Sequence, residues 1–131
     1  MKGCDCMAAI NITPFMNLTQ LIASDDVKPG DVLLLEEGIY HQSVIVTKSN
    51  IRIIARGPGV IFDGKSTLGT AFVLSNVTGI IIKGIKIRHY RFNGILISSG
   101  SGNRIIENTI SNTLSNGIDV QSSGSNLFWK N

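Results

Sequence analysis

The stretch Asn-Gly-Ile-Leu-Ile at residues 93–97 recurs as Asn-Gly-Ile-Asp-Val at residues 116–120, a shift of 23 positions. A second stretch, Asn-Arg-Ile-Ile-Glu-Asn at 103–108, recurs at 126–131 as Asn-Leu-Phe-Trp-Lys-Asn with the same shift. Two separate segments that share one period indicate an internal repeat, and a repeat of this length is typical of a solenoid.

The period continues upstream, where residues 70–74 lie 23 positions before the first copy and residues 79–84 lie 24 positions before the second. Within a coil, apolar residues alternate with polar or glycine residues over a few positions, as they do from Ile80 to Ile87. This alternation is typical of short strands with one buried face. A coil of this length cannot bury its own inner face, so coils must stack at about 4.8 Å per rung. The sequence therefore predicts an all-β fold, a single-stranded right-handed parallel β-helix.

The composition agrees with this fold class. The chain has 131 residues, enough for one domain with a core, and it is 43% hydrophobic but only 6% aromatic, with 14 glycines. The apolar residues are therefore mostly aliphatic, which favours many short strands separated by turns.

The repeated asparagines lie where each coil turns. Asparagine tolerates positive φ at sharp corners, and asparagines in register on successive rungs can form a hydrogen-bonded ladder. We predict three ladder pairs: Asn93 with Asn116, Asn103 with Asn126, and Asn108 with Asn131.

The residues before the repeats predict a cap. Met16 to Ala23 reads as a short amphipathic helix with Asn17 or Thr19 near its start, and a helix there would cover the first rung. Strands are expected at 32–35, 43–46, 51–55 and 60–62, and a corner at 36–40. We divide the chain into an N-terminal arm, 1–16, with Cys4 and Cys6, and a β-helix, 17–131, with an N-terminal cap and no evident C-terminal cap.

Three motifs carry a family resemblance. They are Lys-Pro-Gly-Asp-Val at 28–32 followed by Glu-Gly-Ile-Tyr at 37–40, the Ile-Phe-Asp-Gly turn at 61–64, and the Asn-Gly-Ile repeats. With these motifs, residues 17–131 resemble the pectate-lyase-like superfamily, in particular its carbohydrate-binding and sugar-hydrolase type of repeat. The resemblance implies the β-helix, but this superfamily includes lyases, hydrolases, epimerases, adhesins and structural modules.

The aspartates do not predict a catalytic centre. An enzyme of that superfamily acting on polyuronides is expected to carry clustered aspartates for Ca²⁺ with a basic residue, or a pair of aspartates for hydrolysis. Here the aspartates are mostly single and in turns, and Asp119, which should point outward from a strand, is interpreted as a solvated residue. We predict no catalytic residue, no metal site and no cofactor, so an enzyme is the less favoured interpretation.

A basic cluster is the candidate ligand-binding site. It comprises Lys83, Lys86, Arg88, His89, Tyr90 and Arg91, with Arg104 about one rung further on. Arginine pairs with carboxylates and tyrosine offers a stacking face, which together suit an acidic polysaccharide. The alternative is an outer face whose cations keep the solenoid soluble.

The cysteines, the net charge and the hydropathy restrict the possible partners and the localisation. Cys4 and Cys6 are too close along the chain for an unstrained disulfide, which leaves free thiols, intermolecular cross-links or a shared metal site. A net charge of +3 from scattered cations does not predict nucleic acid binding, and no apolar run of about 18 residues predicts a membrane span. No Sec signal peptide is evident as written, so the localisation is open between a cell or spore surface, reached by another route, and the cytoplasm.

The last predicted strand holds Leu127, Phe128 and Trp129, and no cap follows it. An uncapped solenoid end pairs with whatever fits it. Our first hypothesis is a non-enzymatic structural solenoid, in which copies stack head to tail into a fibre or surface layer and Cys4 or Cys6 cross-link them. The alternatives are a module that binds or modifies an acidic polysaccharide, or an N-terminal fragment of a larger β-helix enzyme.

Overall fold

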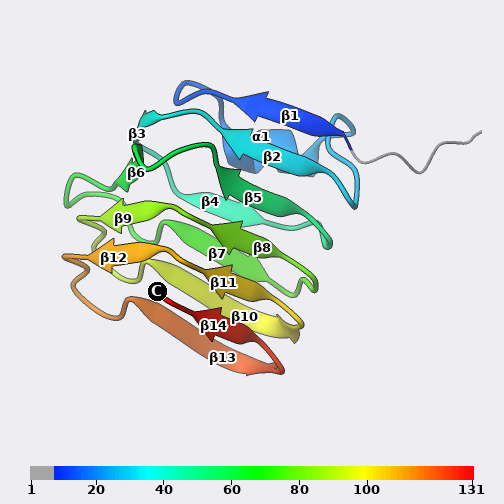
Figure 1. Cartoon of the computed structure of the whole chain (residues 1–131). Coiled ribbons are helices and arrows are strands. Elements are labelled where there is room, and N and C mark those ends of the chain that lie inside the picture. Colours follow the sequence, from blue (N-terminus) through cyan, green and yellow to red (C-terminus); the bar gives the residue numbers. More distant parts are fainter. Residues whose placement is uncertain (1–7) are drawn as a thin grey trace, which may run out of the picture.

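The computed structural model describes residues 8–131, which form a right-handed parallel β-solenoid of about 5 turns (Figure 1). Three parallel sheets run along it. The six-stranded sheet contains β1 (Ala9–Ile12), β2 (Val32–Leu35), β5 (Arg52–Ala55), β8 (Ile81–Lys83), β11 (Arg104–Ile106) and β14 (Leu127–Trp129).

The other two sheets have four strands each. The β4–β13 sheet contains β4 (Val44–Val46), β7 (Phe72–Ser75), β10 (Ile95–Ser101) and β13 (Ile118–Gly124). The β3–β12 sheet contains β3 (Gly38–Tyr40), β6 (Val60–Asp63), β9 (Lys86–Arg88) and β12 (Thr109–Ser111). From β2 onward, each complete coil thus contributes one strand to each sheet, and the predicted all-β solenoid with one short helix is confirmed.

The strand register follows the sequence repeat. Ile95 pairs with Ile118 and Arg104 pairs with Leu127, and in both pairs the partners are one repeat apart. Upstream, the spacing from β5 to β8 is longer, with Arg52 opposite Ile81, because the loop between β6 and β7 lengthens that coil. The period therefore sets the register of the last coils, whereas loop insertions absorb the irregularity of the first ones.

Inward side chains form one continuous core. In the six-stranded sheet the register aligns Leu33, Ile53, Ile82 and Ile105, which are all fully buried. Aromatic rings fill another part, where Tyr40 stacks on Phe62 at 4.7 Å between ring centroids. Each fully buried aliphatic or aromatic side chain contributes about 1.5–3 kcal/mol.

The asparagine ladders are present at all three predicted pairs. Asn126 Oδ1 accepts from the Asn103 N–H at 3.0 Å, and Asn131 Oδ1 accepts from the Asn108 N–H at 3.2 Å. In the third pair the direction is reversed, since Asn93 Oδ1 accepts from the Asn116 N–H at 3.1 Å.

The N-terminal cap is the helix α1 (Leu18–Ala23), which begins slightly later than predicted. Asn17 is its N-cap and accepts from the Gln20 N–H at 3.0 Å, as expected for this residue type. Met16 lies instead in a turn, where its N–H donates to the Thr13 carbonyl at 3.1 Å. The helix covers β4 as a cap should, because the Thr19 hydroxyl accepts from the Ile45 N–H at 3.0 Å and donates to the Ser43 carbonyl at 3.2 Å.

Two elements differ from the sequence prediction. Residues 9–12, which we placed in the N-terminal arm, form β1 and pair in parallel with β2. This strand is anchored by Asp31, whose carboxylate accepts from the Ala8 N–H at 3.0 Å. Residues 38–40 were predicted as part of a corner but form β3, because the inward ring of Tyr40 packs on Phe62 of β6.

Candidate functional site

The predicted basic cluster is built on β9 and the corner that follows it. Lys86 is exposed and Arg88 is partly exposed, and both point outward because the residue between them, Ile87, is buried. Arg88 Nε lies 3.0 Å from Asp63 Oδ2 on the neighbouring strand β6. One edge of the guanidinium is therefore occupied by a carboxylate of the protein.

Asp63 is the anionic partner in this cluster. Burial acts to raise the pKa of Asp63, but the hydrogen bond from the Lys65 N–H at 2.8 Å and the Arg88 guanidinium outweigh it and lower the pKa. The exposed His41 lies one rung away, with Nδ1 at 3.0 Å from the Asp63 carbonyl oxygen. The carboxylate is thus held ionised as a structural partner of Arg88.

Tyr90 does not offer the predicted stacking face. Its side chain is 1% exposed, and its hydroxyl donates to the Gln42 carbonyl at 2.7 Å. Burial raises the pKa of this hydroxyl above its ordinary value. The prediction was wrong because the corner after β9 turns the Tyr90 ring into the core.

Phe92 takes the exposed position that we had assigned to Tyr90. Its side chain is 56% exposed and its ring lies over Gly69, where an added Cβ would come within 3.1 Å of Cδ2. Arg91, the adjacent residue, is also exposed. No sequence signal separated the two aromatic residues, because both lie in a corner where strand alternation no longer applies.

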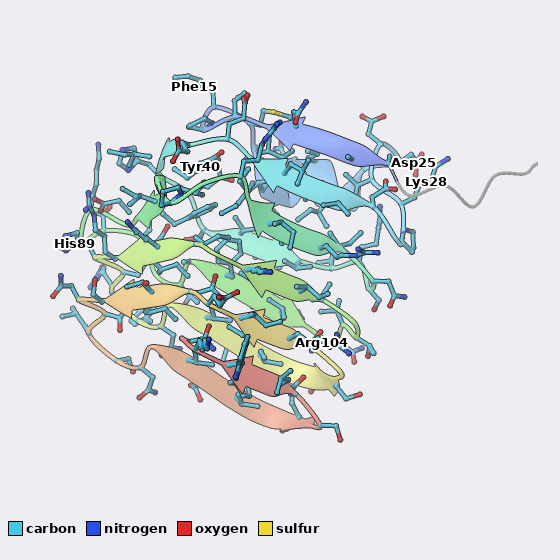
Figure 2. All side chains as sticks on the ribbon, in the orientation of Figure 1. Phe15, Asp25, Lys28, Tyr40, His89 and Arg104 are labelled. Atoms are coloured by element: carbon cyan, nitrogen blue, oxygen red, sulfur yellow. The ribbon has the colours of Figure 1, made fainter. Side chains whose placement is uncertain are left out.

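Arg104 does not join the cluster, contrary to the sequence prediction. It begins β11 in the six-stranded sheet, whereas Arg88 ends β9 in the β3–β12 sheet. Figure 2 shows Arg104 and His89 on opposite sides of the solenoid. Lys83 also belongs to the six-stranded sheet, where its Nζ lies 3.8 Å from Glu107 Oε1. The cluster therefore reduces to Lys86, Arg88, His89 and Arg91, with Phe92 beside them.

Asp119 remains a single carboxylate. It stands opposite Leu96, which in turn stands opposite Val73, as the repeat predicts. Its Oδ2 accepts from Gln121 Nε2 at 3.1 Å. Among residues 8–131, no three His, Cys, Asp or Glu side chains form a group that could hold a metal ion.

The C-terminal coil is the second candidate site. Of the large hydrophobic side chains that residues 8–131 expose, more than half lie in this coil, namely Leu114, Val120, Leu127, Phe128 and Trp129. Phe128 continues the inward column after the fully buried Ile105, yet it is 39% exposed. Val120 likewise continues the column after Ile97 and is 40% exposed. Residues 127–129 were predicted from the sequence, whereas Leu114 and Val120 were not.

The predicted cross-linking residues, Cys4 and Cys6, lie outside the described residues. In the part of the chain that the structure describes, no helix is long and apolar enough to cross a membrane.

The fold and the two surfaces define a class of protein, a capped parallel β-solenoid built from a repeating coil. No known protein family, no curated protein and no solved structure matches the chain. Its resemblance to the pectate-lyase-like superfamily therefore stays a prediction from the motifs.

Proposed function

We propose that this chain is a non-catalytic structural β-solenoid that associates with a second copy through its C-terminal coil, residues 114–131. The observation that supports this proposal best is the change in burial along one inward column. Ile53, Ile82 and Ile105 are fully buried, and the next residue, Phe128, is 39% exposed. An exposed core end with open strand edges is a surface that favours pairing with another edge.

The two ends of the solenoid differ in a way that bears on the mode of association. At the N-terminal end, α1 covers the edge of β4, and the turn before it packs against β3, where Pro14 lies over Gly38. The third sheet ends there in β1, over which the described residues place no such helix or turn. In a head-to-tail stack, strand pairing would therefore pass from one copy to the next in only one of the three sheets. Two C-terminal coils facing each other offer three strand edges each.

This asymmetry favours a tail-to-tail pair over the fibre that we predicted from the sequence. Such a pair is two-fold symmetric and closes after two copies, whereas a head-to-tail contact repeats without end. Cys4 and Cys6 precede β1 and belong to the other end of the chain. The pair therefore does not require a cysteine cross-link.

Sedimentation velocity over a range of protein concentrations, with and without reductant, tests this function. We expect a monomer that converts to a dimer as the concentration rises, to the same extent in both conditions. Phe128→Asp should keep the chain monomeric, because a carboxylate would be buried in the contact. Phe15→Asp is the matched control, since Phe15 is 98% exposed at the opposite end (Figure 2) and its substitution should leave the dimer intact.

Three results would overturn the proposal. A wild-type chain that is monomeric at every concentration would mean that the C-terminal coil does not pair with a copy of itself. Filaments that shorten on reduction would support the cysteine-linked fibre instead. A dimer lost with Phe15→Asp but kept with Phe128→Asp would place the contact at the other end.

Binding of an acidic polysaccharide is a second candidate, which the position of Phe92 favours. An exposed aromatic ring next to Arg91 replaces the stacking face that Tyr90 lacks, and Arg88 and Lys86 lie on the strand before it. Polygalacturonate binding by isothermal titration is the test. Arg88→Ala with Arg91→Ala should abolish binding, whereas Arg104→Ala, on the other sheet, should not affect it. Absence of binding by the wild-type chain would exclude this candidate for that polymer.

A further inference from the structure

The chain contains two Asn-Gly pairs at equivalent positions of the repeat, Asn93-Gly94 and Asn116-Gly117, and each is followed by isoleucine. Asn-Gly is the dipeptide most open to spontaneous deamidation, because glycine leaves the following backbone nitrogen unhindered. The nitrogen must approach the side-chain amide carbon of the asparagine for the reaction to begin. The two pairs have nearly the same local chemistry, so any difference between them comes from the fold.

Asn93-Gly94 is held by contacts at both reacting groups. Asn93 is 8% exposed, and its Oδ1 accepts from the Asn116 N–H at 3.1 Å. The nucleophile, the Gly94 nitrogen, donates to the Asn116 carbonyl at 3.1 Å. The space beside Gly94 is also filled, since a Cβ there would lie 2.6 Å from Ile110 Cγ2. Cyclisation at this pair would first require the coil to open.

Asn116-Gly117 lacks these contacts in the described structure. Asn116 is exposed, its side-chain amide has no hydrogen-bond partner in the described chain, and neither does the Gly117 N–H. The space beside Gly117 is less tightly filled than that beside Gly94, because a Cβ there would make only an ordinary van der Waals contact, with Ile110 Cγ2 at 3.7 Å. Both the electrophile and the nucleophile are therefore accessible.

We propose that Asn116 is a site of spontaneous deamidation in the folded chain, whereas its repeat partner Asn93 is protected. The Gly117 nitrogen attacks Asn116 Cγ, a C–N bond forms, and the amide nitrogen leaves as ammonia together with the proton from the Gly117 N–H. Water then opens the resulting succinimide at either of its two C–N bonds. The products are aspartate or isoaspartate at position 116.

The reaction has a structural consequence. Asn116 donates its N–H to Asn93 Oδ1 and accepts the Gly94 N–H, so it fastens the start of β13 to β10. Isoaspartate inserts one more atom into the main chain at this point and shifts both hydrogen-bonding groups. The product should therefore loosen the C-terminal coil from the rest of the solenoid. This inference concerns the unpaired chain, because a second copy on the C-terminal coil would cover Asn116.

The test is peptide mapping by mass spectrometry after incubation of the folded chain at mildly alkaline pH and low concentration. We expect deamidation at Asn116 to be at least about tenfold faster than at Asn93, because the Asn93 contacts must open before that site can react. In denaturant the two sites should react at similar rates. Gly117→Ala should slow the reaction at Asn116, and circular dichroism would verify that this variant is folded.

Equal rates at the two sites in the folded chain would overturn the inference, as would slower reaction at Asn116. A chain that unfolds during the incubation is detected by circular dichroism. In that case the same comparison is made at lower temperature, where the wild-type chain stays folded. The dimer equilibrium is measured separately, so failure of the association proposal does not affect this result.

Discussion

Asn103 Oδ1 accepts a hydrogen bond from the backbone N–H of Ile80 at 2.9 Å, across one full coil of the solenoid. The same side chain donates from Nδ2 to the Val77 carbonyl at 3.2 Å, and Asn103 is fully buried. One asparagine thus satisfies two backbone groups of the preceding rung at a corner where the strand ladder is interrupted. Because these groups are buried, losing their partner should be costly.

The first prediction is that Asn103→Ala lowers the free energy of unfolding by about 2–3 kcal/mol, because two buried backbone groups lose their partner. Asn126→Ala is the matched variant, one coil later in the same repeat position. Asn126→Ala should lower the free energy of unfolding by less, because Asn126 is only half-buried and water can replace its hydrogen bond. Urea unfolding measures both, and an equal or larger loss for Asn126→Ala would contradict this account of the ladder.

The second prediction compares the glycines of the two Asn-Gly pairs. Gly94→Ala should destabilise the chain by about 1–3 kcal/mol, because the added methyl group meets Ile110 Cγ2 at 2.6 Å and the Gly117 carbonyl oxygen at 2.8 Å. Gly117→Ala should change stability by less than about 0.5 kcal/mol, because its Cβ has only ordinary contacts. Thermal unfolding of the two variants distinguishes them. Similar melting temperatures would mean that the corner at Gly94 relaxes freely.

The third prediction concerns alkaline pH. Burial, together with the Glu36 carboxylate, raises the pKa of Tyr40 to about 12 from an ordinary value of 10.0. Because the pKa of Tyr40 is higher in the folded chain than in the unfolded chain, its contribution to stability is complete below pH 10. This contribution is lost as the pH rises from about 10 to 12. The free energy of unfolding should fall over this range, and that of the Tyr40→Phe variant should fall less steeply.

Ultraviolet absorbance of tyrosinate checks the same point directly. Tyr40 and Tyr90 are the two tyrosines of the chain, and both pKa values are raised. As long as the chain is folded, tyrosinate should therefore appear only well above pH 10. Its appearance near pH 10 in a chain that is still folded, and its loss in Tyr40→Phe, would show that the hydroxyl of Tyr40 is not held by the Glu36 and Ile12 carbonyls.

The fourth prediction concerns acid pH. The pKa of Asp63 is lowered from 3.8, so its contribution to stability is present above that pH and is lost as the pH falls below it. Asp63→Asn should therefore lower stability at neutral pH and flatten the decrease in acid. Asp25→Asn controls for net charge, because it also removes one carboxylate, an exposed one, but leaves the ion pair of Asp63 with Arg88 in place. An Asp63→Asn variant with the acid profile of the wild type would contradict the role of this pair.

The repeat predicted correctly those features that depend on register. Residues one repeat apart that match in type stand opposite each other in the sheets, and the three asparagine pairs follow from the same spacing. The sequence also placed Asn17 or Thr19 near the start of the helix, and the structure makes Asn17 the N-cap, whose side chain accepts a local backbone hydrogen bond. These are relations between residues close in sequence or one coil apart.

The corners were predicted less well. Tyr90 and Phe92 are both aromatic, and they lie in a segment without strand alternation, so the sequence did not reveal which ring was buried. Arg104 and Arg88 are separated by less than one coil, and only the path of that coil assigns them to different sheets. Strand β1 was missed because the short segment Ala-Ile-Asn-Ile becomes a strand only when β2 provides its partner.

By itself the sequence determined the solenoid class and the register of the last coils, because both follow from the period of the repeat. It also determined which residues of a recognised strand face the core, because side chains alternate along a strand. Tertiary structure alone decided which corner side chains turn inward, which cations share a sheet, and that Phe128 and Asn116 are left exposed while Ile105 and Asn93 are covered. The reason is physical. Equivalent residues of a repeat have the same local preferences, but burial depends on what the neighbouring coil places over them.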